Sequence, residues 1–382
     1  MKFPEKLAQK LEIRRQQNAF RQLPQPNGLI DLASNDYLGF SKSEAIFSET
    51  HEYLVSNHFT QNGATGSRLI SGNHPLYEIT EEYIADFHES ETALIFNSGY
   101  DANVGFFSSL PQKDDVILYD ELCHASIRDG IRLSNAKSYK FAHNDPENLE
   151  ELIVRHQSEN TKVYVATESV FSMDGDTPPL ERFVCICEKH QAFLVIDEAH
   201  ALGVFGNTEG SGMIQELQLQ HKVFARIMTF GKGLGCHGAA IIGSEELKDY
   251  LVNFARSFIY TTGLSPHALA TILISYQHLQ QRKDALEQLK KNIIHFNQTK
   301  NLLGLKPLFV YSKSTIQCAV VPGNEKVKSI AIQLQQNGFD VKAILSPTVP
   351  TGQERLRICL HSYNSEAEIS QLLQSIAQFT LA

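Results

Sequence analysis

Short apolar runs alternate with longer helical patterns from about residue 28 to about residue 245 of the chain. The runs are rich in β-branched and aromatic residues and are bounded by Gly, Asp, Ser or Asn. Continuous apolar strands are typical of a sheet covered on both faces, and the helices between them predict a mostly parallel sheet with right-handed crossovers. The predicted strands are Thr92–Phe96, Asp115–Tyr119, Lys162–Thr167, Phe193–Ile196 and Arg226–Phe230.

A further strand is predicted at Gly238–Gly243, close enough to Arg226–Phe230 in sequence to pair with it antiparallel. The fold class that follows is α/β, with a large domain built on a sheet of the seven-stranded, mostly parallel type.

The N-terminal residues 1–22 have the pattern of a charged, amphipathic helix. Leu7, Leu11 and Phe20 form its predicted apolar side, and the segment LPQPNG at 23–28 ends it.

The pattern changes after about Pro266, where a long polar and apolar helical stretch at 267–302 begins. A smaller α+β domain is predicted beyond it, with strands at 315–321, 339–345 and 354–360 and helices at 326–336 and 366–379. We therefore expect an N-terminal helix and arm at 1–45, a large domain at 46–275 and a small C-terminal domain at 276–382.

Composition places the chain among ordinary globular proteins, because 42% of its 382 residues are hydrophobic and 20% are charged. The net charge of -9 argues against a dedicated nucleic-acid-binding protein, which needs a basic surface. The sequence has no apolar run of the roughly 18 residues that a membrane helix needs, and its charged start lacks a signal peptide's apolar region. The six cysteines are scattered without a CxxC pair, so reduced thiols in a cytoplasmic protein are expected, and no metal site.

Two short motifs suggest chemistry that their context does not support. Gly233–Gly238 fits the dinucleotide pattern GxGxxG, but a strand follows it where a helix is required. Asp197–His200 spells DEAH, as in helicases, but the chain has no phosphate loop of the type GxxxxGK[ST].

Polar residues follow five predicted strands at the point where each strand ends. In an open α/β sheet these carboxyl ends form the ligand-binding edge. The residues are Ser98, Gly99 and Tyr100 after the first strand, His124 after the second, Ser172 after the third, Asp197 and His200 after the fourth, and Thr229 and Lys232 after the fifth.

Asp197 and Lys232 indicate which ligand this edge binds. Asp197 directly follows four apolar residues, so its charge needs a cationic partner. Lys232 lies in the glycine-rich loop FGKGLG, which leaves space around an amine that can act as a Schiff-base nucleophile. Together with Gly99 and Tyr100 at a predicted helix start, which suit a phosphate, these residues favour pyridoxal 5′-phosphate.

The chain resembles the α-oxoamine synthase family of fold-type I pyridoxal-phosphate enzymes over essentially its whole length. The matching motifs are LASNDYLGFS at 32–41, GATGSRLISGNHPLYEITEE at 63–82, NSGYDAN at 97–103, DELCHASIRDG at 120–130, TESVFSMDGDTPPL at 167–180, IDEAHALGVFG at 196–206, TFGKGLG at 229–235 and FIYTTGLSP at 258–266. One departure is Gly263–Pro266, where the family usually has SLPP.

The resemblance implies a role for each residue around the cofactor. Lys232 would bind it covalently and then act as a base, Asp197 would pair with the pyridine nitrogen, and His124 would stack on the ring. His200 and Ser172 would lie at the phenolic oxygen. Ser98, Gly99, Tyr100 and Thr229 would hold the phosphate, which Thr261 and Thr262 would complete from the second subunit of a homodimer.

The resemblance also implies an acyl transfer to an amino acid. FSMDGDTPPL, SRLISGN and PTVPTGQERLRICL at 347–360 are most similar to family members that condense L-alanine with a pimeloyl thioester, carried by CoA or acyl carrier protein, in biotin synthesis. Arg357 would bind the amino-acid carboxylate, Arg21 and Thr348 match acyl-substrate positions, and Asn35 would contact substrate. Siblings that use glycine with acetyl-CoA or serine with palmitoyl-CoA, and a non-catalytic subunit of the same fold, are the alternatives.

Overall fold

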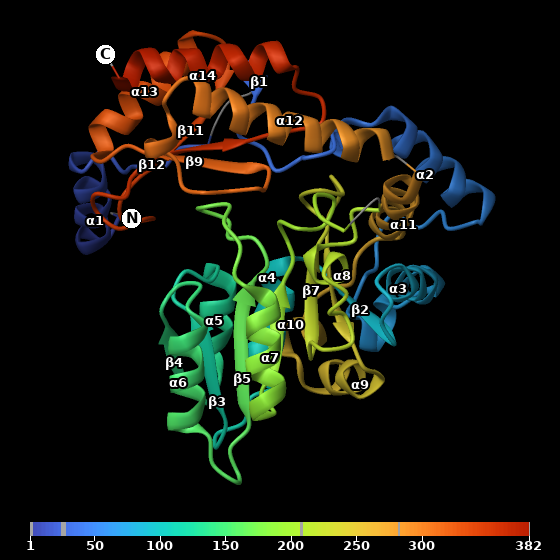
Figure 1. Ribbon diagram of the computed structural model, residues 1–382. Helices are drawn as coiled ribbons and strands as arrows, with labels where there is room; N and C mark the ends of the chain where they lie inside the picture. The colour runs from blue at the N-terminus through green and yellow to red at the C-terminus, as the bar shows by residue number, and fades with distance from the viewer. Residues whose placement is uncertain (1–2, 24–27, 207–208, 282, 382) are drawn as a thin grey trace. The chain divides into compact units, whose positions relative to one another are not determined.

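The computed structural model describes residues 3–23, 28–206, 209–281 and 283–381, and the chain divides into two compact units. Unit 1 comprises Met1–Ser34, Met173–Gly175 and Lys291–Ala382, and unit 2 comprises Asn35–Ser172 and Asp176–Lys290. We describe each unit by itself (Figure 1). The domain boundaries predicted at residues 45 and 275 stay a prediction.

Unit 2 is built on a seven-stranded sheet, which confirms the α/β fold predicted from the alternating pattern. All strands run parallel except β8, which pairs antiparallel with β7, as predicted, and also with β2. Across the sheet the strands are β2 (Thr92–Phe96), β8 (Ala239–Gly243), β7 (Ala225–Thr229), β6 (Phe193–Asp197), β5 (Val163–Glu168), β3 (Val116–Asp120) and β4 (Lys137–Phe141).

The pattern of apolar residues did not predict β4, which forms one edge of this sheet beside β3. Four of its five residues, KSYK, are exposed and only Phe141 is buried. An edge strand needs no continuous apolar run because one of its sides faces solvent, and lysines there hinder pairing with another chain. The predicted strands that correspond to β2, β3 and β5 were correct within one residue at each end because nearly all of their residues are buried, β2 included although it forms the other edge.

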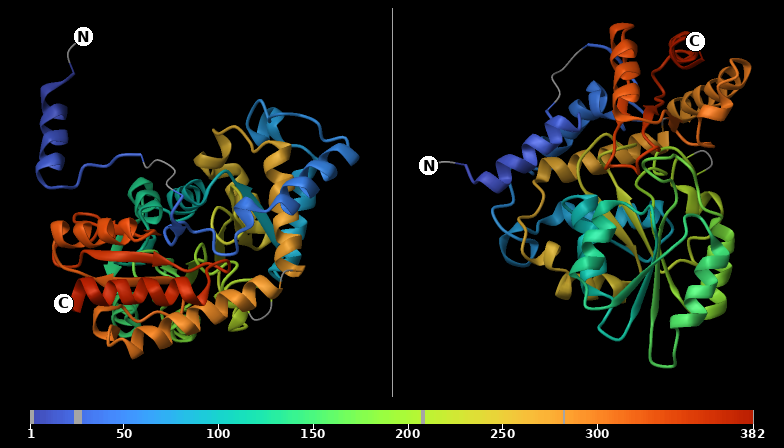
Figure 2. Two further views of the ribbon diagram at one scale, coloured as in Figure 1. Left: turned by 90° about the horizontal axis from the view of Figure 1, so that it is seen from above. Right: turned by 90° about the vertical axis from the view of Figure 1, so that its left-hand side faces the viewer.

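Two layers of helices cover the two faces of the sheet (Figures 1 and 2). Alternate residues of one strand divide between the layers: Ile117 packs into one core cluster, while Val116 and Leu118 pack into the other. The first cluster includes residues of α4 (Gly99–Ser109), α5 (Ala125–Leu133), α9 (Glu245–Phe254) and α10 (Arg256–Ile259); the second includes residues of α6 (Pro146–His156), α7 (Leu180–His190) and α8 (Met213–Glu216).

Three further helices of unit 2 pack together, and one of them, α3, contacts β2. Helix α11 (Pro266–Gln281) contacts α2 (Glu44–Ser56) and α3 (Pro75–Phe87). The single helical stretch predicted at 267–302 consists of α11 and α12 (Lys283–Leu302), with residue 282 between them outside the described residues.

Unit 1 has the smaller α+β arrangement that the sequence predicts for the C-terminal part. Its antiparallel sheet has the order β11 (Lys342–Ile344), β12 (Arg355–Cys359) and β9 (Ile316–Val320), and a two-stranded parallel sheet joins β1 (Ile30–Asp31) to β10 (Phe339–Asp340). Its other helices are α13 (Asn324–Gln336) and α14 (Glu366–Leu381).

The single strand predicted at 339–345 is wrong, because this segment contributes β10 and β11 to two different sheets. The chain turns at Val341, which is fully buried and whose N–H donates to the carbonyl of Phe339. A turn between the apolar residues Phe339 and Val341 leaves no Gly or Pro signal in the sequence. The segment 339–345 therefore has the pattern of one continuous strand.

The N-terminal helix is shorter than predicted, since α1 spans Glu5–Gln16 and Asn18 takes a left-handed conformation with φ of 53°. Phe20 therefore lies beyond the helix, and Leu7 and Leu11 are 45% and 41% exposed rather than packed in a core. Of the segment predicted to end the helix, residues 24–27 lie outside the described residues.

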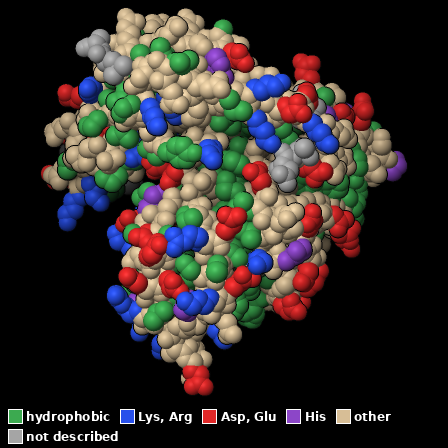
Figure 3. Space-filling view, in the orientation of Figure 1, with side chains coloured by type: hydrophobic (Ala, Val, Ile, Leu, Met, Phe, Trp, Pro, Cys, Tyr) green, Lys and Arg blue, Asp and Glu red, His purple; other side chains and the backbone are tan. Residues whose placement is uncertain are grey.

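Among the described residues, no helix is long and apolar enough to cross a membrane. Acidic and basic side chains are interspersed over the face of unit 2 seen in Figure 3. Four of the six cysteines are buried.

Close packing of α4 on α5 is the contact that we expect to be most sensitive to a small substitution. A Cβ added to Gly130 of α5 would lie 2.8 Å from the carbonyl oxygen of Asn103 and 3.1 Å from the Cα of Val104, both in α4. Gly130→Ala must separate the two helices, and we expect it to lower the free energy of unfolding by about 1–3 kcal/mol. Chemical denaturation measures this. Gly304→Ala is a poor control because its φ is positive, whereas Gly63→Ala has open space and should have little effect.

Candidate active site

The residues predicted to bind the cofactor gather at the end of the seven-stranded sheet where its parallel strands have their carboxyl ends. β2, β3, β5, β6 and β7 are mutually parallel, so their carboxyl ends meet at this end. Ser98 and Gly99 follow β2, His124 follows β3, Ser172 follows β5, Asp197 ends β6 and Thr229 ends β7.

Asp197 is buried and is held by a short network of polar side chains. Its Oδ2 accepts a hydrogen bond of 2.8 Å from Nδ2 of Asn103, and its Oδ1 accepts one from the N–H of Ala199. The amide of Asn103 also donates to Oγ of Ser126, which lies 2.7 Å from Nδ1 of His124. Asn103 thereby links the carboxylate at the end of β6 to the imidazole that begins α5.

Glu168 is a second buried carboxyl group beside this network. Burial, together with the charge of Asp197, raises its pKa to about 8, so near neutral pH it is mostly a neutral acid. Its Oε1 accepts a hydrogen bond of 2.6 Å from the N–H of His124. Burial also lowers the pKa of His124, which favours the neutral imidazole. Glu168 and His124 therefore both favour their neutral forms near Asp197.

The start of α4 forms a cradle against the end of β7. Ser98 caps the helix by accepting from the N–H of Asp101, and a Cβ added to Gly99 would lie 2.3 Å from Oγ1 of Thr229. A side chain at position 99 would occupy the space between the helix start and Thr229. The backbone N–H groups at the N-terminus of a helix suit an anion such as a phosphate. Tyr100 is half exposed, and its hydroxyl donates to Asp129.

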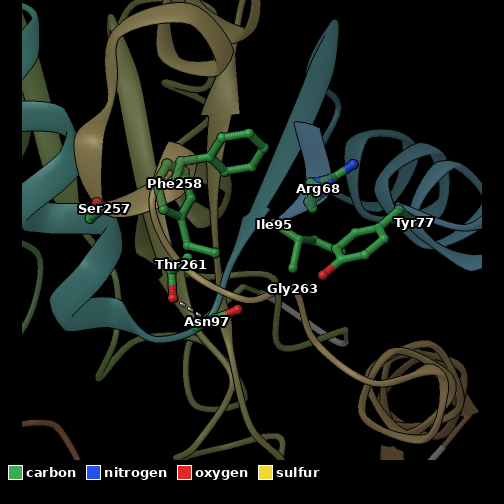
Figure 4. Close-up of a pocket in the computed structure, with 9 residues that line it drawn as sticks. Arg68, Tyr77, Ile95, Asn97, Ser257, Phe258, Thr261 and Gly263 are labelled. Atoms are coloured by element: carbon green, nitrogen blue, oxygen red, sulfur yellow. Dashed lines mark hydrogen bonds between the residues drawn. The ribbon is translucent and has the colours of Figure 1, made fainter. Parts of the chain in front are cut away.

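Thr261 and Thr262 lie beside the same helix start within one chain. Asn97 donates from Nδ2 to Oγ1 of Thr261 at 3.1 Å and to the carbonyl of Thr262 at 2.7 Å. Figure 4 shows Asn97 and Thr261 among the residues that line a small cavity, together with Arg68 and Tyr77. The contribution of these threonines to a second subunit stays a prediction.

Lys232 lies in a tightly packed loop, with its Nζ 2.8 Å from Nε2 of His200. A Cβ at Gly233 would lie 2.2 Å from the carbonyl oxygen of Leu202, and one at Gly235 would lie 2.2 Å from the N–H nitrogen of Ser41. These glycines therefore permit close backbone packing that fixes the lysine, whereas the sequence analysis expected them to leave space around the amine.

His200 also contacts Tyr37, whose hydroxyl oxygen lies 2.6 Å from Nδ1 of the imidazole. The same hydroxyl lies 3.2 Å from Oδ1 of Asn35, a predicted substrate contact. Ser172 is partly buried in the turn that follows β5.

The other predicted substrate residues belong to unit 1. Nη2 of Arg21 lies 3.4 Å from Oγ1 of Thr348, and both residues line a cavity to which Arg14 and Phe20 also contribute. Arg357 is buried in the central strand β12, and its Nη1 lies 2.9 Å from Sγ of Cys359.

Sequence reasoning missed four residues that support the site: Tyr37, Asn103, His143 and Glu168. Tyr37, Asn103 and Glu168 lie inside the motifs that carry the family resemblance, so their positions were marked while their contacts were not. His143 lies outside those motifs and left no signal.

His143 joins the loop that carries His124 to the loop that follows Ser172. Its Nδ1 lies 2.9 Å from Asp120 and its Nε2 lies 2.8 Å from Asp176. Asp120 also accepts from the N–H of Leu122 in the first loop. Burial lowers the pKa of His143, but the hydrogen bonds and charges of the two carboxylates outweigh it and raise the pKa to about 10.

Comparisons with known proteins agree on the family of this chain. Residues 27–376 match the model of aminotransferase class I and II. The chain is 40% identical over 371 residues to an 8-amino-7-oxononanoate synthase of Emericella nidulans, covering 92% of this chain and 89% of that protein.

Two solved structures have the same fold as this chain. The 8-amino-7-oxononanoate synthase of Francisella tularensis has a TM-score of 0.78 and 29% identity, covering 92% of this chain and 98% of that one. A serine palmitoyltransferase with pyridoxal phosphate as its internal aldimine has a TM-score of 0.88 and 25% identity, covering 98% and 96%.

The paired carboxylates around His143 predict a pH-dependent stability. A histidine whose pKa is about 10 when folded and about 6.5 when unfolded stabilises the fold fully below pH 6.5 and loses this effect as the pH rises toward 10. We expect His143→Gln to lower the unfolding temperature at pH 6, and the difference from the parent to shrink steadily between pH 7 and pH 10.

Thermal unfolding of both proteins across this pH range measures the difference. His156→Gln is a control, because that histidine stacks on Tyr139 at the surface and its pKa is lowered rather than raised. A difference between His143→Gln and the parent that is constant with pH would contradict the charged form of His143.

Proposed function

Because the chain belongs to the aminotransferase class I and II family, we propose that it is a pyridoxal-phosphate enzyme that condenses L-alanine with a pimeloyl thioester. The products are 8-amino-7-oxononanoate, CO2 and the free thiol carrier, and the reaction belongs to biotin synthesis. The observation that carries the proposal is the group of Asp197, His124, Lys232 and the α4 cradle at one sheet edge, in a chain 40% identical to an 8-amino-7-oxononanoate synthase.

The residues at this edge fit pyridoxal phosphate in both charge and shape. The cradle of Gly99 and Thr229 at the helix start suits the phosphate, and the buried carboxylate of Asp197 suits a protonated ring nitrogen. When bound, the cofactor supplies an electron sink for negative charge at the substrate Cα. Burial of Glu168 and His124 as neutral groups leaves Asp197 to balance the cationic ring.

The chain's own residues then have distinct tasks in the reaction. Lys232 would hold the cofactor through Nζ and, once freed by the amino acid, would take the proton from the alanine Cα. His124 would lie against the ring face, and His200 and Ser172 would hydrogen-bond at the phenolic oxygen. Ser98, Gly99, Tyr100 and Thr229 would hold the phosphate.

Two predicted substrate residues orient the amino acid in this proposal. Arg357 binds the alanine carboxylate with its planar guanidinium, and Asn35 contacts the substrate. The position of the bound carboxylate determines which bond at Cα is broken. The bond to hydrogen breaks first, and after condensation the bond to the carboxylate breaks and releases CO2.

Arg21 and Thr348 favour a pimeloyl chain over the acetyl and palmitoyl chains of sibling enzymes. Their side chains meet in a cavity with Arg14 as a second arginine. An acyl chain that ends in a carboxylate needs such cations, whereas an acetyl or palmitoyl chain offers them no charge.

We also propose that the protein is a cytoplasmic homodimer, in which Thr261 and Thr262 of one copy complete the phosphate site of the other. Exposed apolar side chains at Leu69, Ile70 and Tyr260 support a covered surface in this part of unit 2, because they are 52%, 86% and 72% exposed. The presence of Lys232 argues against a non-catalytic subunit of the same fold.

A substrate panel tests the proposed reaction. Alanine, glycine and serine are each offered with acetyl-, palmitoyl- and pimeloyl-CoA and with pimeloyl acyl carrier protein, and release of thiol and CO2 is measured. We expect the highest kcat/KM for alanine with a pimeloyl thioester. A higher kcat/KM for glycine with acetyl-CoA, or for serine with palmitoyl-CoA, would refute the acyl assignment while leaving the family unchanged.

The same panel tests Arg21 directly. Arg21→Gln loses a charged hydrogen bond to the distal carboxylate, so kcat/KM for pimeloyl-CoA should fall about 10- to 100-fold while that for uncharged heptanoyl-CoA stays near the parent value. Arg182→Gln, which removes an exposed arginine paired with Glu147, is the matched control. Equal losses with both thioesters would contradict recognition of the carboxylate.

A further inference from the structure

A line of four polar side chains runs through unit 2 from Asn35 to Lys232. Oδ1 of Asn35 lies 3.2 Å from the hydroxyl of Tyr37, that hydroxyl lies 2.6 Å from Nδ1 of His200, and Nε2 of His200 lies 2.8 Å from Nζ of Lys232. Tyr37 is fully buried and His200 is 3% exposed. Groups buried this deeply keep their hydrogen-bond directions, because exchange with water is costly.

The donors and acceptors at the ends of this line determine its direction. The amide oxygen of Asn35 can only accept, so the Tyr37 hydroxyl donates its one hydrogen to it. The hydroxyl oxygen then accepts from His200, which places the imidazole hydrogen on Nδ1. If the hydroxyl donated to His200 instead, the lone pairs of two oxygens would face each other at 3.2 Å. Nε2 is therefore left as the acceptor that faces the lysine.

We propose that Tyr37 is a positioning residue that holds His200 with its hydrogen on Nδ1, so that Nε2 accepts the proton of the Lys232 ammonium. In this step the N–H bond of Lys232 breaks, a new N–H bond forms at Nε2, and the lysine nitrogen keeps the electron pair with which it attacks an aldehyde. The imidazolium that forms is stabilised by its Nδ1–H bond to Tyr37.

This inference rests on the proposed function in one respect only, namely that Lys232 is the residue that captures pyridoxal phosphate. The orientation of His200 itself is a property of the chain without cofactor. Both can therefore be tested separately.

The first test measures how fast the cofactor-free protein captures pyridoxal phosphate covalently between pH 6 and pH 10, followed by absorbance. Tyr37→Phe removes the hydroxyl that stabilises charged His200. Its capture rate near neutral pH should fall about tenfold, the scale of one hydrogen bond to a charged group, and should converge with the parent rate at high pH where the lysine is already neutral.

The chain offers a matched control, because Tyr276 is another fully buried tyrosine whose hydroxyl bonds a buried histidine, His88, at 3.0 Å. Tyr276→Phe removes the same atoms from a similar pair and should leave the pH profile of capture unchanged. A Tyr37→Phe profile that matches the parent, or that is lowered equally at every pH, would overturn the inference.

Lys232→Ala tests the lysine assignment by itself. Loss of covalent capture in this variant supports the assignment. Persistent capture would refute the role of Lys232 in both proposals, while the orientation of His200 by Tyr37 would still be decided by the measurement below.

A second measurement needs no substitution at Tyr37 and so does not depend on the folding of that variant. In cofactor-free protein labelled with 15N at histidine, His200 is assigned by comparison with His200→Gln, and its tautomer is read from the two ring nitrogens. We expect a protonated Nδ1 and an unprotonated Nε2. The opposite tautomer would overturn the inference.

Discussion

Burial of the Asp197 carboxylate is the constraint around which the rest of unit 2 is arranged. A charge at the end of a buried strand is costly unless hydrogen bonds and a cation compensate it. Asn103 and the backbone of Ala199 supply the hydrogen bonds from within the chain. In the proposed function the protonated cofactor ring supplies the cation, which would explain why an apolar strand ends in an acidic residue at the binding end of the sheet.

The same constraint accounts for the state of the neighbouring groups. Glu168 is buried near Asp197, and its pKa of about 8 means that the pair carries mainly one negative charge near neutral pH. His124 is held neutral by burial and is joined to Asp197 through Ser126 and Asn103. A single carboxylate charge beside a neutral acid and a neutral imidazole suits the protonated nitrogen of a flat ring.

The positions of the site residues could be predicted from the sequence because they are set by the ends of buried strands. The end of β6 is marked by the change from apolar residues to Asp197, and the same holds for Thr229 at the end of β7. The contacts that orient these residues could not be predicted, since Tyr37 reaches His200 across 163 positions of sequence. Edge strand β4 was missed because its exposed residues form no apolar run. The turn at Val341 was missed because the apolar pattern continues through it from β10.

Exchange of the alanine Cα hydrogen with solvent deuterium measures whether the Asp197 carboxylate balances a protonated cofactor ring. Asp197→Asn keeps the shape but removes the charge, so exchange should slow by about two to four decades, the effect of 3–5 kcal/mol from one side of a buried charge pair. Asp145→Asn makes the same change at the cap of α6, where either residue accepts the N–H of Asn148, and should exchange at the parent rate. Exchange in Asp197→Asn that stays close to the parent rate would contradict this balance of charge.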